Sequence, residues 1–297
     1  MPTTNIALRP ITAIGFIGLG VMGEPMCGHL ARRSGLAVMA HDRREEPLQR
    51  VIAAGVRALS PAGMAEQCDM ILLSLPDGMA VQAVLAEIEP LLQPGQIVVD
   101  TSTSPVEITR EIGARLAARN IAYADAPIAR TREAASRGEL SIMVGAEDEV
   151  FAHIRPVLET MGTDITHCGP IGTGQVVKIL NNMLLFQNVC ALAEALAVGR
   201  RNGVSPEILL STVAKGSGDS FALRNHGMKA MIANNYPLRA FSTRYAMKDL
   251  SYALEMAKAA NLDLEGAELT MKRLQQSEAS GFGDEYFPVL RHLIDPS

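Results

Sequence analysis

Three glycines at fixed spacing, directly after a short apolar segment, constrain the fold of this chain more than any other feature. Residues 13–17 have the composition of a buried strand, and Gly18, Gly20 and Gly23 follow before the helical pattern of 24–33. The first glycine permits a tight turn, the second lets the backbone approach a pyrophosphate, and the third lets the helix pack on the strand. N–H groups at the helix start can then hold the phosphates. The pattern predicts a dinucleotide-binding turn made of Gly18, Leu19, Gly20, Val21, Met22 and Gly23.

The same glycine spacing also occurs as a purely structural turn, so the residues around it matter. Asp42 stands at the end of the next apolar segment, 37–41, where an acidic side chain accepts hydrogen bonds from the adenine ribose. Asp42 would repel the 2′-phosphate of NADP, whereas Arg43 and Arg44 could attract it, remain solvated or lie against the adenine ring. We expect NAD as the cofactor, with NADP as the alternative.

Short apolar runs alternate with helical patterns from Thr12 to about Cys168, which is typical of βαβ units and a mainly parallel sheet. Ser60 and Ser104 each precede a proline, so each is expected to cap a helix whose first turn holds that proline. The first part of the chain is therefore predicted to be α/β, a Rossmann-type doubly wound sheet. Its expected strands are Ala13–Ile17, Ala37–His41, Met70–Leu75, Ile97–Asp100, Ile121–Asp125 and Leu140–Val144.

The pattern changes after Gly174, since the remaining residues show helical periodicity. The segment 175–200 is apolar on most faces and is expected to be a long helix joining two halves of the chain. We therefore predict a dinucleotide-binding domain over residues 1–173 and an all-helical substrate and oligomerisation domain over 174–297. Further helices are expected from Pro206, Asp219, Thr243, Glu265 and Asp284.

Composition narrows the possible partners of this 297-residue chain. The hydrophobic content of 48% allows a sizeable core, and the net charge of −5 comes with dispersed Lys and Arg, so nucleic acid is not expected as a partner. The N-terminal residues do not resemble a secretion signal, and polar residues interrupt the most apolar segment, so we expect a cytoplasmic protein without membrane insertion. The four cysteines and six histidines lack the spacing of metal ligands, so no metal is expected.

Several short motifs, in this order and spacing, resemble the β-hydroxyacid dehydrogenase family, which includes 3-hydroxyisobutyrate dehydrogenase, tartronate semialdehyde reductase and sulfolactaldehyde reductase. The resemblance runs from about Thr12 to Leu293. It implies a Rossmann domain, a helical domain of the 6-phosphogluconate dehydrogenase type, an active site in the cleft between them, and homodimers or homotetramers. It also implies hydride transfer between a nicotinamide cofactor and a small β-hydroxy acid or its semialdehyde. The motifs are Gly18–Met26, Leu75–Asp77, Asp100–Thr103, Asp125–Pro127, Lys178–Asn182 and Lys248–Leu250.

Lys178 and Asn182 are four residues apart on the expected long helix, so both side chains emerge on one face. A lysine on so apolar a helix is unusual, and burial would lower its pKa toward a range useful for proton exchange with an alcohol. A lysine extending from the helix edge to solvent is the alternative. The resemblance implies that Lys178 is the catalytic lysine, which protonates the carbonyl oxygen in reduction, and that Asn182 orients the substrate.

The resemblance also implies further contacts to cofactor and substrate. Thr103 would lie near the nicotinamide ribose, and Lys248 would reach the cofactor and attract a substrate carboxylate. Each has a structural alternative: a helix cap for Thr103, a solvated side chain for Lys248 and an ordinary core position for Phe241. The family usually has proline three residues after the threonine, whereas here Pro105 comes two after it. The cofactor contacts implied in this way are Leu75, Pro76, Thr103, Phe241 and Lys248.

The substrate loop departs from the family pattern. The usual Ser-Gly-Gly after Asp-Ala-Pro-Val is replaced here by Ala129, Arg130 and Thr131. An arginine offers a planar fork of donors for an anion, so a side chain rather than the backbone is expected to hold the substrate's charge. Arg130 facing solvent is the alternative. Together with Asn181 beside Asn182, the arginine resembles sulfolactaldehyde reductases, although Ala129 stands where those enzymes have glycine and Leu185 where a polar contact is expected.

The sequence thus predicts an NAD-linked β-hydroxyacid dehydrogenase or semialdehyde reductase with a small anionic substrate bound by Ala129, Arg130, Thr131, Asn181 and Lys248. A sulfonate substrate such as sulfolactaldehyde is the alternative within the class. A non-catalytic nucleotide-binding protein is the alternative from another class, and the presence of Lys178 argues against it. An imine-reducing relative is disfavoured because its catalysis does not use a lysine at this position.

Overall fold

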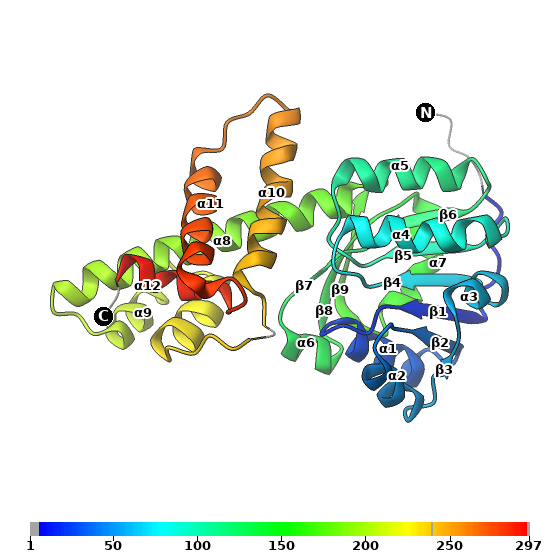
Figure 1. Cartoon of the computed structure of the whole chain (residues 1–297), viewed down its shortest axis with the longest axis horizontal. Coiled ribbons are helices and arrows are strands. Elements are labelled where there is room, and N and C mark those ends of the chain that lie inside the picture. The colour runs from blue at the N-terminus through cyan, green and yellow to red at the C-terminus, as the bar shows by residue number, and fades with distance from the viewer. Residues whose placement is uncertain (1–5, 239, 296–297) are drawn as a thin grey trace. The chain divides into compact units, whose positions relative to one another are not determined.

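A computed structural model gives the structure of residues 6–238 and 240–295. The chain folds into two compact units, Met1–Lys178 and Ile179–Ser297. The boundary that we predicted after residue 173 and the observed boundary both fall within helix α8 (Thr173–Arg201), which begins in the first unit and ends in the second. Figure 1 labels the helices and strands.

The first unit contains one mainly parallel sheet, as the alternating pattern predicted. Its strand order is β3-β2-β1-β4-β5-β6-β8-β7, with β9 paired to β8. The strands from β3 to β6 run parallel, β8 is antiparallel to β6 and β7, and β9 is parallel to β8. The strands are β1 (Ala13–Ile17), β2 (Ala37–His41), β3 (Arg57–Ala58), β4 (Met70–Leu73), β5 (Ile97–Asp100), β6 (Ala122–Asp125), β7 (Ile128–Ala129), β8 (Leu140–Gly145) and β9 (Gly162–Gly169).

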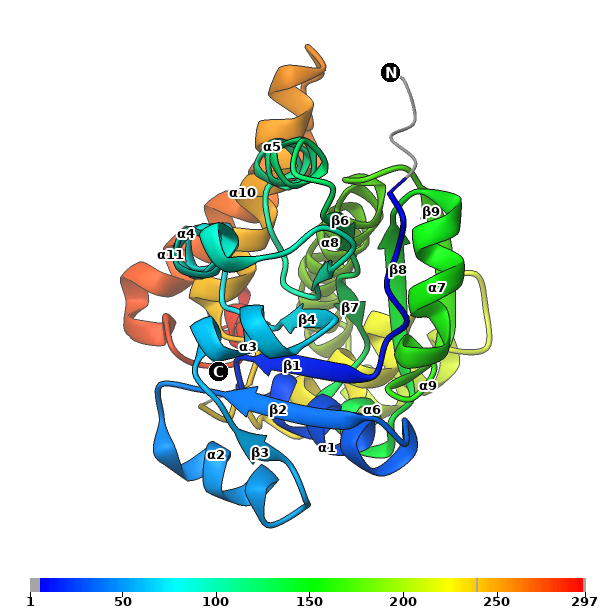
Figure 2. The same cartoon turned by 90° about the vertical axis from the view of Figure 1, so that its right-hand side faces the viewer.

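Helices cover both faces of this sheet, and alternate strand residues point into two hydrophobic clusters. Phe16 and Leu72 pack with residues of α1 and α7, whereas Ile71 and Val98 pack with residues of α3, α4 and α5. Figure 2 shows α4 and α5 on the side of the sheet opposite α7. This is the doubly wound architecture predicted. The helices are α1 (Gly23–Arg33), α2 (Glu45–Ile52), α3 (Pro61–Gln67), α4 (Gly78–Ile88), η1 (Glu89–Leu91), α5 (Val106–Ala117), α6 (Arg132–Arg137) and α7 (Asp148–Leu158).

One of the two predicted serine caps is confirmed and the other is wrong. The Ser60 hydroxyl accepts a 3.1 Å hydrogen bond from the N–H of Gly63 and so caps α3. Helix α5 begins at Val106, and its N-cap is Pro105 with no capping side chain. Ser104 is buried, and its hydroxyl donates to Oδ2 of Asp100 over 3.1 Å. Because the Ser104 hydroxyl bonds the carboxylate of Asp100, it does not cap α5.

The second unit is helical, as predicted. Among its described residues only an isolated bridge, between Ser242 and Tyr286, has β pairing. Helices start where Pro206, Thr243 and Glu265 predicted them, while the helices expected from 219 and 284 begin a few residues later. By length and composition alone α8 is apolar enough to cross a bilayer, a property that core helices of soluble proteins share. The other helices are α9 (Pro206–Val213), η2 (Leu223–Ile232), α10 (Thr243–Ala259), α11 (Glu265–Ser277), η3 (Glu278–Phe282), η4 (Phe287–Leu290) and α12 (Arg291–Ile294).

Candidate functional site

The glycines of the first turn have different structural requirements. Gly18 has a φ of +101°, and a Cβ added there would lie 2.2 Å from the main-chain oxygen of Ser74. A Cβ on Gly23 would lie 2.1 Å from the oxygen of Gly18. A Cβ on Gly20, in contrast, would meet no atom within 4 Å. The fold itself therefore requires Gly18 and Gly23, whereas Gly20 leaves open the space that a bound pyrophosphate would fill.

The start of α1 is suited to an anion. Met22 occupies the N-cap position and provides no capping hydrogen bond from its side chain. The first-turn N–H groups of this 11-residue helix are thus not capped by a side chain, and the helix dipole adds positive potential there. Together with the space beside Gly20, this arrangement fits the phosphates of a dinucleotide.

Asp42, at the end of β2, fastens the turn. Its Oδ2 accepts from the N–H of Leu19 over 2.6 Å, and its Oδ1 accepts from the N–H of Arg44 over 2.8 Å. Partial burial alone would raise the pKa of Asp42, but hydrogen bonds from Arg44 and Leu19 outweigh burial and lower it below its usual value. The carboxylate is therefore ionised at neutral pH and holds the turn in place.

The two arginines after Asp42 differ in their surroundings. The Arg44 guanidinium forms an ion pair with Oδ1 of Asp42 and donates from Nη2 to the oxygen of Leu19 over 2.9 Å. Arg43 is exposed. Arg44 thus stabilises the turn, while the predicted contact between Arg43 and the cofactor stays a prediction.

Two loops at the carboxyl ends of β4 and β5 are bonded to each other. Oγ of Ser102 accepts from the N–H of Leu75 over 2.9 Å, and Oδ1 of Asp100 accepts from the N–H of Ser102 over 2.9 Å. Ser102 is buried, whereas Thr103 beside it is partly exposed and Pro76 is exposed. The carboxyl ends of parallel strands are where ligands of such sheets bind. Leu75 and Thr103 are therefore brought together at the expected edge of the sheet.

A buried carboxylate at the end of β6 holds the start of α8. Oδ1 of Asp125 accepts from the N–H of Gly172 over 2.6 Å, and Oδ2 accepts from the N–H of Gln175 over 2.8 Å. Burial raises the pKa of Asp125 to about 6, against the effect of these hydrogen bonds. Burial also raises the pKa of Asp100, its neighbour in register on β5. Neither aspartate was assigned a role from the sequence, although both stand at the ends of predicted strands.

Asn182 and Lys248, from different helices of the second unit, meet at one carboxylate. Oδ2 of Asp249 accepts from Nδ2 of Asn182 over 2.7 Å, and its Oδ1 forms a 3.0 Å ion pair with Nζ of Lys248. Asn181 donates from Nδ2 to Oδ1 of Asn182 over 3.1 Å. Lys178 lies one turn before Asn182 on α8, on the same face of the helix. Asn181, Asn182 and Lys248, three of the predicted site residues, are thus connected through Asp249. Asp249 itself was not predicted from the sequence.

Aromatic rings surround Lys248 on its own helix. Its Nζ lies 5.3 Å from the ring centroids of both Tyr245 and Tyr252, within the range of cation–π attraction. Phe241 packs against Phe186 and Phe287, with centroids 5.6 and 5.7 Å away. These ring contacts support the structural alternative for this residue, although Phe241 is only partly buried, and contact between Phe241 and the nicotinamide stays a prediction.

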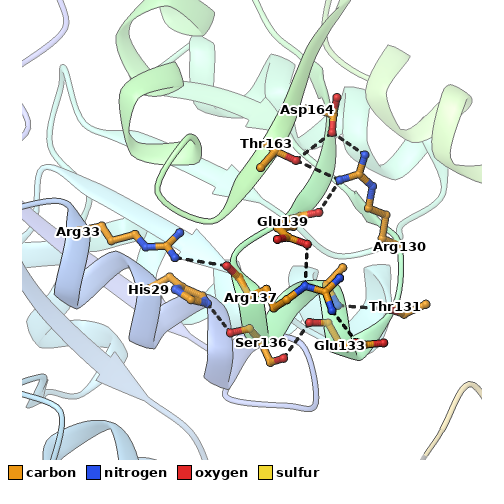
Figure 3. A network of polar contacts seen from close by, with 11 residues as sticks. His29, Arg33, Arg130, Thr131, Glu133, Ser136, Arg137, Glu139, Thr163 and Asp164 are labelled. Carbon is orange, nitrogen blue, oxygen red and sulfur yellow. Dashed lines mark hydrogen bonds and ion pairs between the residues drawn. The ribbon is translucent and has the colours of Figure 1, made fainter.

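Arg130 is held by groups of its own domain (Figure 3). Its guanidinium forms a 2.5 Å ion pair with Oδ2 of Asp164 and donates to the oxygen of Glu139 over 2.7 Å and to Oγ1 of Thr163 over 3.0 Å. The Thr163 hydroxyl and the Arg130 charge hold the pKa of Asp164 below its usual value. The φ of Arg130 is +86°, a backbone conformation that favours glycine. This is the position where the family has glycine, so the backbone keeps the glycine conformation although the side chain has changed.

The residues on either side of Arg130 have structural contacts. Ala129 belongs to β7 and pairs with Ser141 of β8. The Thr131 hydroxyl caps α6 by accepting from the N–H of Ala134 over 3.3 Å. Substrate contacts from Ala129, Arg130 and Thr131 stay predictions, and for Arg130 they would require the guanidinium to leave Asp164 or to share it with a ligand.

Histidines and cysteines offer no metal site within residues 6–238 and 240–295, where no group of three metal-ligating His, Cys, Asp or Glu side chains occurs. His29 and His167 instead bond main-chain oxygens, of Ser136 and Ala146 respectively. The four cysteines are free thiols: Cys27, Cys68, Cys168 and Cys190.

Two family models match consecutive parts of the chain. The NAD-binding domain of 6-phosphogluconate dehydrogenase matches residues 13–169. The NAD-binding domain of NADP-dependent 3-hydroxyisobutyrate dehydrogenase matches residues 172–292. The first model covers the glycine turn and the three strand-end aspartates Asp42, Asp100 and Asp125, and the second covers α8 and α10.

Characterised relatives match over most of their length. The chain is 36% identical to 2-(hydroxymethyl)glutarate dehydrogenase of Eubacterium barkeri, covering 92% of this chain and 91% of the relative. It is 32% identical to NAD-dependent L-serine dehydrogenase of Pseudomonas aeruginosa, covering 96% and 98%. Among solved structures, 3-hydroxyisobutyrate dehydrogenase of Mycobacterium tuberculosis with L-serine superposes with a TM-score of 0.88 at 27% identity, covering 96% of this chain and 99% of that one.

These matches span the glycine turn, Asp42, the helical second unit and the motifs around Lys178 and Lys248. They account for a nicotinamide cofactor and for a hydroxy acid as the class of substrate. The chain therefore belongs to the β-hydroxyacid dehydrogenase family and is an NAD(P)-dependent hydroxyacid oxidoreductase.

Proposed function

We propose that this enzyme interconverts a small β-hydroxy acid and its semialdehyde, with Lys178 as the general acid and base. The observation that carries the proposal is the junction at Asp249, where Asn182 and Lys248 meet although 66 residues separate them in the sequence. Both were predicted as site residues from separate motifs. Their meeting supports a common binding function.

The names of the relatives suggest the shape of the substrate. 2-(Hydroxymethyl)glutarate, L-serine and 3-hydroxyisobutyrate are all carboxylic acids with a hydroxymethyl group on the α-carbon. They differ in the other group on that carbon. We propose that the substrate of this chain shares the 3-hydroxypropanoate core, whose carboxylate the Lys248 ammonium would attract.

The proton transfer falls to Lys178. In the direction of reduction, its ammonium gives a proton to the carbonyl oxygen of the semialdehyde; in oxidation, its neutral amine takes the proton from the hydroxyl group. Asn182, one turn further along α8, would hold the substrate oxygen in line for this transfer. The nicotinamide cofactor supplies or accepts the hydride when bound. Oxidation of the alcohol thus releases one hydride and one proton, which balances the reaction.

A sulfonate substrate is the second candidate, and Arg130 is the observation that favours it. A guanidinium at the position of a family glycine adds a donor fork that matches a sulfonate as well as a carboxylate. In the structure Asp164 neutralises this charge. Asp249 pairs with Lys248 in the same way, so the preference for a carboxylate over a sulfonate substrate rests on the relatives, whose names are those of dehydrogenases acting on carboxylic acids.

Cofactor preference, location and assembly complete the proposal. NAD is preferred over NADP because the ionised Asp42 would repel a 2′-phosphate and Arg44 is paired with it. The enzyme acts in the cytoplasm as a homodimer or homotetramer assembled through its helical domain. Size-exclusion chromatography with light scattering tests the assembly.

The test is a spectrophotometric assay of the purified chain. The semialdehydes of 3-hydroxyisobutyrate, L-serine and 2-(hydroxymethyl)glutarate, together with sulfolactaldehyde, are each supplied with NADH and with NADPH. Turnover of a carboxylate semialdehyde with NADH supports the proposal. Preference for sulfolactaldehyde favours the second candidate, and a large preference for NADPH contradicts the cofactor assignment. Consumption of neither nucleotide with any of these semialdehydes contradicts the proposed substrate class.

A further inference from the structure

Gln175 connects helix α8 to the loop that follows β5. Its side chain is fully buried. The amide Oε1 accepts from the N–H of Ser104 over 3.1 Å, and Nε2 donates to the main-chain oxygen of Ser102 over 2.8 Å. Both ends of one amide are thus bonded to main-chain groups on either side of Thr103. The loop cannot shift along α8 without breaking at least one of these buried hydrogen bonds.

The backbone around Gln175 is fastened as well. The Asp125 carboxylate accepts from the N–H groups of Gly172 and Gln175, so the first turn of α8 is held to the end of β6. A Cβ on Gly174 would lie 2.4 Å from the main-chain oxygen of Met143, so the helix start lies directly on β8. The main chain of Gln175 is therefore fixed relative to β6 and β8, and its side chain bonds the loop from this fixed position.

The loop is in turn connected to its neighbour. Oγ of Ser102 accepts a hydrogen bond from the N–H of Leu75. The Asp100 carboxylate accepts from the N–H of Ser102 and from the hydroxyl of Ser104. The side chains of Ser102 and Ser104 are consequently buried, whereas Thr103 between them is partly exposed. The three segments that carry Leu75, Thr103 and the start of α8 form one hydrogen-bonded body.

Lys178 lies three residues after Gln175 on α8, within the same compact unit. We propose that Gln175 is a positioning residue that fixes Lys178 relative to the loop of Thr103, and hence relative to the nicotinamide that this loop is expected to contact. The inference rests on the proposed role of Lys178 and on the expectation that Thr103 lies near the nicotinamide ribose. Proton transfer and hydride transfer act on adjacent atoms of the substrate, so a small displacement between the two segments slows the chemical step.

A matched control exists in the same domain. Gln96 is 1% exposed, and its Nε2 donates to the oxygens of Ala65 and Cys68 over 2.8 and 2.6 Å, while its Oε1 accepts from Gln93. It precedes β5, whereas the Thr103 loop follows the other end of that strand. Gln175→Met and Gln96→Met therefore each remove a buried amide that bridges main-chain groups, at opposite ends of β5.

The experiment compares both variants with the wild type in melting temperature, NADH affinity, kcat and the primary isotope effect with deuterated NADH. Both variants should melt at a lower temperature, and both should bind NADH within about threefold of the wild type. Only Gln175→Met should lose kcat, by at least about tenfold, with an increased isotope effect because the chemical step becomes slower. Gln175→Glu keeps the shape and the acceptor for Ser104 but loses the donor to Ser102, so it should fold and show an intermediate loss of kcat.

A kcat of Gln175→Met within about twofold of that of Gln96→Met would overturn the inference. Similar kcat values in the two variants would mean that any loss comes from reduced stability and not from the position of Gln175. If Lys178→Met keeps its turnover, the proposed function fails. If Lys178→Met is inactive while Gln175→Met and Gln175→Glu are fully active, the proposed function stands and this inference alone is wrong.

Discussion

Nδ2 of Asn182 donates a 2.7 Å hydrogen bond to Oδ2 of Asp249, and this bond fixes which end of the asparagine amide is left for other partners. With Nδ2 directed to the carboxylate, Oδ1 is the acceptor end of the amide, and it accepts from Asn181. A substrate hydroxyl that donates to Oδ1 of Asn182 would thus be oriented indirectly by Asp249, because Asp249 holds the amide of Asn182 in place.

The first prediction follows from this bond. Asp249→Ala removes the acceptor and the partner of Lys248, so kcat/KM should fall by about 10²-fold, whereas Asp249→Asn keeps an acceptor and should lose less than about tenfold. Asp295→Ala is the control, because Asp295 is a buried carboxylate of the same unit, paired with Arg200. It should keep its kcat/KM, and equal losses for Asp249→Ala and Asp295→Ala would contradict the orienting role.

The glycine turn yields a contrasting pair of variants. Gly18→Ala places a methyl group against the oxygen of Ser74 at a positive φ, so the free energy of unfolding should fall by at least about 2 kcal/mol. Gly20→Ala fills open space, so stability should change by less than about 1 kcal/mol, while the Kd for NADH rises at least about tenfold. Chemical denaturation and fluorescence titration with NADH measure the two effects. Unchanged NADH affinity in Gly20→Ala would show that the pyrophosphate lies elsewhere.

Replacement of Arg130 by glycine separates its structural role from its proposed binding role. The change relieves the strain of a positive φ, of order 1 kcal/mol, and removes an ion pair between exposed side chains, which contributes little to stability. Stability should therefore change little. If the guanidinium binds the substrate anion, KM should rise at least about tenfold. Arg137→Ala, which loses ion pairs in the same network, is the control (Figure 3). An unchanged KM in Arg130→Gly would limit Arg130 to holding Asp164.

Asp125 should make stability depend on pH in a defined direction. Its pKa in the folded chain is about 6, above the usual aspartate value of 3.8, so its favourable contribution to stability is present below pH 3.8 and is lost as the pH rises through 6. Since one pKa unit corresponds to about 1.4 kcal/mol, the stability of the wild type relative to Asp125→Asn should fall by up to about 3 kcal/mol between pH 4 and pH 7. Urea denaturation of both proteins at several pH values measures this. A parallel pH dependence in the two would contradict the raised pKa.

The sequence predicted those parts of the fold in which burial and local pattern agree. The expected bounds of β1, β2 and β5 coincide with the observed ones because both faces of these strands are covered and their residues are almost all apolar. Strand β9 was missed because it pairs with only one neighbour and carries Asp164 and His167, so it lacks a hydrophobic run. Strand β7 has two residues, too few for any periodicity.

Candidate site residues could be named from the sequence where a motif lies in one segment, but contacts between distant segments could not be predicted. Gly18, Asp42 and Lys178 could be named from their spacing and from family resemblance. Gln175 gave no such signal, because its side chain bonds two main-chain groups of a loop about 70 residues earlier in the sequence. The role assigned to Ser104 was wrong for the same reason: the sequence shows a serine before a proline but not the competing carboxylate.

If Lys178 moves the proton, Lys178→Met should lose activity without losing the cofactor. The decisive measurement is the kcat of Lys178→Met with NADH and the best carboxylate semialdehyde, made beside the Kd of the same variant for NADH. We expect kcat to fall by about 10²- to 10⁴-fold while the Kd stays within about threefold of the wild type. A variant with near-normal kcat would show that another group transfers the proton.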